Sequence, residues 1–82
     1  MRYYDNGSFY SVTVTRHEVE AFASQWPCCS LPRRAITFQF DKRSDDLVDI
    51  LPYSIADKVD GPEALALSED AQAYARTRKE SK

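Results

Sequence analysis

The side chains with the most scope for chemistry in this sequence are two adjacent cysteines, Cys28 and Cys29, and a single histidine, His17. A nucleophilic cysteine needs a nearby base that raises its thiolate fraction, and a structural zinc site needs about four ligands at spacings such as C-x2-C. Adjacent cysteines supply neither arrangement, and neighbouring residues cannot form the loop-closing disulfide of small secreted domains. We therefore expect no catalytic centre, no metal site and no cofactor.

Acidic residues are concentrated in the second half of the chain. From Asp41 to Asp70 nine acids accompany three bases, whereas the full chain has 13 acids and 11 bases. The spacing of the acids lacks the glycine and the terminal glutamate of an EF-hand loop, so a calcium site is not indicated. We interpret the acids instead as a charged surface for a partner. The predicted partner-binding acids are Asp41, Asp45, Asp46, Asp49, Asp57 and Asp60.

Nucleotide binding and acyl transfer find no support in the sequence. The chain has two glycines, Gly7 and Gly61, and both stand where a turn or a helix start is expected. A phosphate-binding loop and a Gly-x-Ser-x-Gly elbow each require glycines that the chain does not have.

The first element that must position these side chains is an N-terminal β-hairpin. Asn6-Gly7 lies between two segments rich in aromatic and β-branched residues, a combination typical of a two-residue turn. With these two residues at the turn, Tyr4 would face Phe9. Alternation then puts Tyr10, Val12 and Val14 of the second strand on the core side, and Tyr4 and Phe9 on the outer side.

A helix should follow directly. Thr15 and Glu18 have the spacing of a capping box, and Val14 and Val19 that of a hydrophobic staple. Apolar residues recur at helical spacing as far as Trp26, and Pro27 should end the helix. His17 then lies opposite the apolar stripe and should face solvent. Residues 27–32 are expected to form a connector framed by two prolines.

The second half of the chain predicts another hairpin and another helix. Residues 35–41 alternate apolar and polar side chains, a polar turn follows, and residues 47–51 supply the returning strand. The sequence from Pro52 to Val59 fits either a loop or a single helical turn. Gly61-Pro62-Glu63 opens a helix that should run to about Lys79, with residues 80–82 frayed.

These elements predict an α+β fold with the order ββαββα. Both amphipathic helices can be buried if they lie on one face of a four-stranded, mostly antiparallel sheet, which gives a two-layer single domain over residues 1–82. The relative order of the two hairpins in the sheet stays open. No segment approaches the length of a membrane span and no secretion signal is visible, so we expect a small soluble cytoplasmic protein.

The outer face of the sheet is the second predicted partner-binding surface. Tyr4 and Phe9 would give it an aromatic pair of the kind enriched in interface hot spots. Single-stranded RNA binders also display aromatics on a sheet, but they add basic residues and a different element order. Direct nucleic-acid binding is therefore disfavoured.

By elimination, the sequence favours a non-enzymatic binding protein. Its acidic surface suggests an inhibitor or modulator of a larger complex, with a protein partner that presents a basic nucleic-acid-binding surface. Phages and mobile elements encode small proteins of this type, such as anti-CRISPR and anti-restriction proteins. The main alternative is a structural homodimer or an assembly subunit; a small RNA-binding domain and a cysteine-dependent enzyme rank lower. A monomer and a homodimer remain open.

Overall fold

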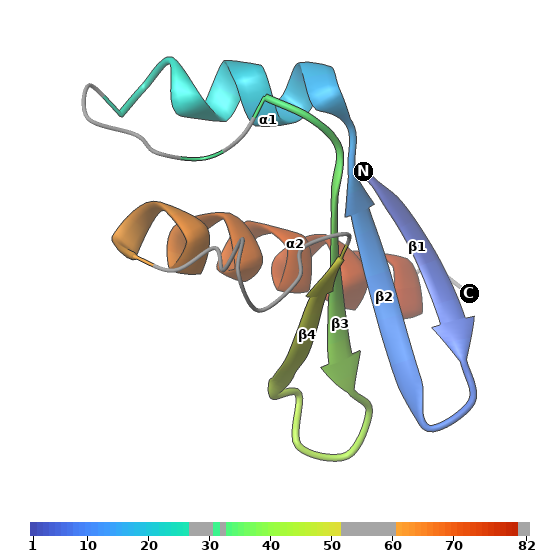
Figure 1. The fold of residues 1–82 in the computed structure, drawn as a ribbon. Coiled ribbons are helices and arrows are strands. Elements are labelled where there is room, and N and C mark those ends of the chain that lie inside the picture. Colours follow the sequence, from blue (N-terminus) through green and yellow to red (C-terminus); the bar gives the residue numbers. More distant parts are fainter. Residues whose placement is uncertain (27–30, 32, 52–60, 81–82) are drawn as a thin grey trace.

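The computed structural model describes residues 1–26, 31, 33–51 and 61–80, with side chains through residue 78 (Figure 1). The strands are β1 (Arg2–Asn6), β2 (Phe9–Val14), β3 (Ile36–Asp41) and β4 (Leu47–Leu51), and the helices are α1 (Arg16–Ala23) and α2 (Pro62–Glu80). The four strands form one antiparallel sheet in the order β1-β2-β3-β4. The α+β class and the ββαββα order are thereby confirmed. The hairpins lie side by side through the pairing of β2 with β3, whereas the prediction for residues 52–59 falls outside the described residues.

The turn of the first hairpin lies one residue later than predicted. Asn6 pairs with Phe9, so Gly7 and Ser8 form the two-residue connection and Tyr4 faces Ser11. Gly7 alone of these two has a positive φ, 78°, which is typical of a type II′ turn, where glycine takes the first central position. The predicted pairing of Tyr4 with Phe9 is therefore wrong. Because the register moves by two residues, every side chain stays on its predicted face.

One face of the sheet carries the core. The inward positions of β2 and β3 are buried, and they hold Tyr10, Val12, Val14, Ile36, Phe38 and Phe40. The ring of Tyr10 stacks on that of Phe40, with centroids 5.1 Å apart. Val19 of α1 and the buried residues of α2 belong to the same cluster. Helix α2 packs on this face, and α1 closes the core at the end of the sheet where β2 leads into it (Figure 1). The two-layer arrangement follows from this one-sided burial.

Helix α1 begins as its sequence predicts. The Thr15 hydroxyl accepts the Glu18 N–H, the Glu18 carboxylate accepts the Thr15 N–H, and the capping box is complete. The helix ends at Ala23, earlier than the apolar stripe suggested. Two i→i+3 backbone bonds, from Gln25 to Phe22 and from Trp26 to Ala23, carry the chain on in turns to Trp26.

Helix α2 crosses behind the sheet in Figure 1 and packs chiefly on β2. Its buried stripe holds Ala64, Leu67, Ala71 and Ala75. Three of these four side chains are alanines, and small residues opposite the large rings of the sheet allow the two layers to interdigitate. The helix therefore contributes little volume to the core, and the large aromatic and aliphatic side chains of β2 and β3 supply much of it.

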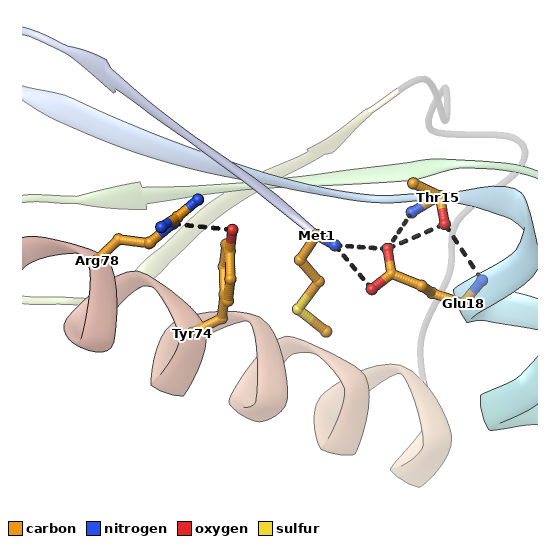
Figure 2. Close-up of polar contacts among 5 residues, drawn as sticks. All are labelled: Met1, Thr15, Glu18, Tyr74 and Arg78. Atoms are coloured by element: carbon orange, nitrogen blue, oxygen red, sulfur yellow. Dashed lines mark hydrogen bonds and ion pairs between the residues drawn. The ribbon is translucent and has the colours of Figure 1, made fainter.

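The amino terminus is tied to the start of α1, as Figure 2 shows. The amino group of Met1 lies 2.7 Å from both carboxylate oxygens of Glu18, the residue that completes the capping box. Burial opposes ionisation of Glu18, but the hydrogen bonds from the Met1 amine and from Thr15 outweigh it and lower the pKa of this carboxyl. The Glu18 side chain therefore holds two places in the chain: the start of α1 and the amino-terminal end of β1.

The lowered pKa of Glu18 predicts an acid-sensitive fold. A carboxyl whose pKa is lower in the folded state contributes stability above its unfolded pKa and loses it as the pH falls through the folded pKa. Glu18→Gln should be less stable than the wild type at neutral pH, and the gap should narrow in acid. Urea denaturation over a pH series measures this. Glu20→Gln, which removes the exposed pair with Arg16, is the matched control. A pH-independent gap for Glu18→Gln would contradict the assignment.

Candidate functional site

In the described part of the chain, no group of three or more histidine, cysteine, aspartate or glutamate side chains could hold a metal ion. His17 is exposed on α1, as predicted, and Cys28 and Cys29 lie outside the described residues. An open depression of about 600 Å³ lies between the two hairpin turns, lined by Gly7, Ser8, Asp41, Lys42 and Arg43. Its lysine already pairs with Asp5 at 2.7 Å, so the depression carries no free pair of reacting groups.

Asp41, one of the predicted partner-binding acids, organises the turn of the second hairpin. Its carboxylate accepts the backbone N–H of Arg43 at 2.8 Å and that of Ser44 at 3.4 Å. Its own backbone N–H and C=O bond to Asp46 and Asp45 across the same turn. A short acidic side chain that accepts backbone donors two and three residues ahead is a common way to stabilise a turn. The Asp41 carboxylate is therefore engaged in shaping the hairpin.

Asp45, a second predicted partner-binding acid, faces the protein rather than a partner. Its carboxylate accepts the hydroxyl of Tyr10 at 2.8 Å, and its backbone carbonyl accepts the side-chain amide of Gln72 at 2.6 Å. Its φ of 57° lies in the left-handed region, which aspartate tolerates better than most residues. The pKa of Tyr10 is raised to about 12, mainly by burial and next by the hydrogen bond to Asp45. Asp45 thus connects the turn to β2 and to α2.

The remaining predicted acids divide into two groups. Asp46 and Asp49 are exposed, so they retain the charge that the prediction assigned to them. Asp57 and Asp60 lie outside the described residues. Asp49 faces Gln39 across the β3–β4 pair, which places it on the outer side of the sheet, away from the core. The structure therefore does not gather Asp41, Asp45, Asp46 and Asp49 into one uniform patch.

Tyr4 and Phe9 lie on the outer face of the sheet, as predicted, although they are not a directly facing pair. Tyr4 is 46% exposed on the edge strand β1, and Phe9 is half-buried between Asn6 and Asp41 of the neighbouring strands. The middle of this face holds small hydroxyl side chains, with Thr13 and Thr37 hydrogen-bonded at 3.0 Å. Tyr4 is therefore the aromatic residue that this face offers to a partner.

A feature that the sequence analysis missed is the apolar edge of the sheet. Leu47, Val48 and Leu51 of β4 are 40%, 52% and 43% exposed. The sequence of β4 gives no clear alternation, so its pattern alone does not distinguish a strand buried on both faces from one left open. The missing information was the strand order. Among the described strands, β4 is last in the sheet, so these side chains have a neighbouring strand on one side only.

Comparisons of the chain with protein-family models, with curated proteins and with solved structures find no match. Within the described part of the chain, neither helix combines the length and the apolar character needed to cross a membrane. Any assignment of function therefore rests on the surfaces described above.

The inward orientation of Asp45 predicts that this residue acts on stability. Asp45→Ala removes the acceptor for the Tyr10 hydroxyl and leaves a residue without a local polar side chain at positive φ, so it should cost about 1–3 kcal/mol. Asp45→Asn keeps an acceptor and tolerates the backbone, and should cost less. The exposed neighbour gives the control: Asp46→Ala should change the free energy of unfolding by no more than about 0.5 kcal/mol. Equal losses for Asp45→Ala and Asp46→Ala in chemical denaturation would refute the distinction.

Proposed function

We propose that this protein is a non-enzymatic binding protein that occupies a basic surface on a larger macromolecular complex and thereby inhibits or modulates it. The observation that carries the proposal is the one-sided burial of the sheet. The buried residues of both helices share one core with the inward face, and the opposite face carries an exposed aromatic residue, Tyr4, on β1 and an exposed acid, Asp49, on β4. A flat face with an aromatic anchor and peripheral charge is typical of protein interfaces.

The charge of this face supports a basic partner. On the described strands, Asp41 and Asp49 lie on the outer side together with one base, Arg2. The adjoining turn adds the exposed acid Asp46 and the exposed base Arg43. Charges at the rim of an interface mainly speed association and select partners of opposite sign. Basic surfaces of this kind commonly bind nucleic acids. Small phage or mobile-element inhibitors, such as anti-CRISPR and anti-restriction proteins, are the class that best combines this size, this charge and the absence of any catalytic constellation in the described residues.

A pull-down with tagged protein at low and high salt, followed by mass spectrometry of what is retained, tests the proposal. The partner should be retained at low salt and largely released at high salt, because exposed charges more than a Debye length apart are screened. Retention of the same partner at all salt concentrations would argue against an electrostatic surface. A concentration-dependent oligomer with no retained partner would favour the homodimer instead.

Point variants then test the surface itself. Neutralising Asp46 or Asp49 to asparagine should weaken binding about two- to fivefold, mostly through slower association. Tyr4→Ala should weaken it about tenfold or more, while Tyr4→Phe keeps the ring and most of the affinity. Asp70→Asn is the matched control, because Asp70 is exposed on α2 and not on the open sheet face. Surface plasmon resonance with the identified partner gives both rates, and an effect of Asp70→Asn equal to that of Asp49→Asn would contradict the assigned face.

A further inference from the structure

The two edges of the sheet differ in how well they are protected against pairing with another strand. The outer strand β1 carries charged residues near both ends, Arg2 and Asp5, and Asp5 is paired with Lys42 at 2.7 Å. The opposite outer strand, β4, has the sequence Leu-Val-Asp-Ile-Leu and a single charge. Natural proteins usually protect an open edge with charges, prolines or bulges. By that measure β1 is guarded by charges near both ends, whereas β4 has one charge, Asp49, and one irregularity in its pairing with β3, next to Val48.

The exposed apolar area of the described chain is concentrated on β4. Three of its five exposed large hydrophobic side chains belong to this strand, namely Leu47, Val48 and Leu51. β4 is last in the sheet order, so among the described strands it has a neighbour, β3, on one side only (Figure 1). An extended segment added on the other side would gain backbone hydrogen bonds and cover these side chains.

Asp49, at the centre of β4, limits which kind of strand can pair with this edge. Its carboxylate accepts the backbone N–H of Ile50 at 2.8 Å. This backbone donor therefore has a side-chain partner, in a strand that has one neighbour among the described strands. A second copy of the chain, paired antiparallel about this centre, would place Asp49 directly opposite Asp49. Like charges directly opposite each other destabilise a strand pair. Shifting the register by two residues would instead place the carboxylate opposite a leucine.

We propose that β4 accepts an extended segment of the partner as a fifth strand, and that this segment carries a lysine or arginine opposite Asp49 between apolar residues. The cation would neutralise the one charge on the edge and draw the carboxylate away from the Ile50 N–H, which then becomes available to the added strand. The flanking apolar side chains would pack against Leu47, Val48 and Leu51. This inference deepens the proposed function, because it names the backbone and charge pattern of the segment that is bound.

Synthetic peptides test the charge pattern directly. The probe is a peptide with the sequence Leu47–Leu51 in which lysine replaces the central aspartate, extended at both ends by polar residues for solubility. In NMR titrations of the labelled full chain, it should shift the β4 amides and slow the hydrogen exchange of the Ile50 N–H. A matched peptide with glutamate at the centre should bind about fivefold or more weakly. Equal binding of the two peptides would overturn the role of Asp49.

Variants of the protein and of the peptide separate charge from backbone pairing. Asp49→Lys should reverse the preference, so that the glutamate peptide binds better, whereas Asp46→Asn should leave the preference unchanged. Methylation of the peptide nitrogens on the edge facing β4 keeps every side chain and should abolish binding. Binding that survives methylation, or shifts confined to Tyr4 and the outer face, would overturn strand addition.

The two proposals fail in different ways. A natural partner that is lost with Tyr4→Ala but never protects the β4 amides would reject strand addition and leave the proposed function standing. Concentration-dependent protection of the same amides in the wild-type protein alone would identify a second copy as the occupant and reject the partner segment. Sedimentation velocity of the wild type, run beside the exchange measurement, would detect this self-association.

Discussion

The contact on which most of this structure depends is the hydrogen bond from the Tyr10 hydroxyl to Asp45, 2.8 Å long. Tyr10 is fully buried on β2 and stacks on Phe40 of β3, while the backbone carbonyl of Asp45 receives the side chain of Gln72 on α2. These contacts connect β2 and β3 with the β3–β4 turn and with α2. A chain of this length has a small core, and buried polar groups are costly when left unpaired. Here the ring fills core volume, and its polar end is satisfied by the turn that begins β4.

Local signals predicted the elements of this fold well. The capping box at Thr15 and Glu18 and the alternation in β2 and β3 are short-range patterns, and each produced the element expected. The first turn was placed one residue early because Asn-Gly and Gly-Ser are both acceptable turn dipeptides. The local sequence does not distinguish these two turns, and the structure has the later one, with Asn6 paired to Phe9.

The candidate site was predicted less well, for a physical reason. The number of acids along a sequence does not show which of them form hydrogen bonds within the protein. Asp41 accepts turn amides and Asp45 accepts the Tyr10 hydroxyl, and both roles depend on a turn whose geometry is set by long-range contacts. Asp46 and Asp49 fulfil the expectation of exposure because they stand beside these positions without the same partners. Of the four described acids in the predicted surface, two stabilise the second hairpin, and the other two are exposed on it.

Strand order decides which of these features face outward to a partner. The same five residues of β4, placed between two strands, would be a buried apolar strand with one costly charge. At the end of the sheet the apolar side chains become a surface, and the charge becomes the feature that discriminates between partners. Asp49 then disfavours the pairing of β4 with itself and favours a segment of opposite charge, since specificity requires both effects. Because β1 is protected by its own charges and by the Asp5–Lys42 pair, we expect an added strand at the β4 edge and not at the β1 edge.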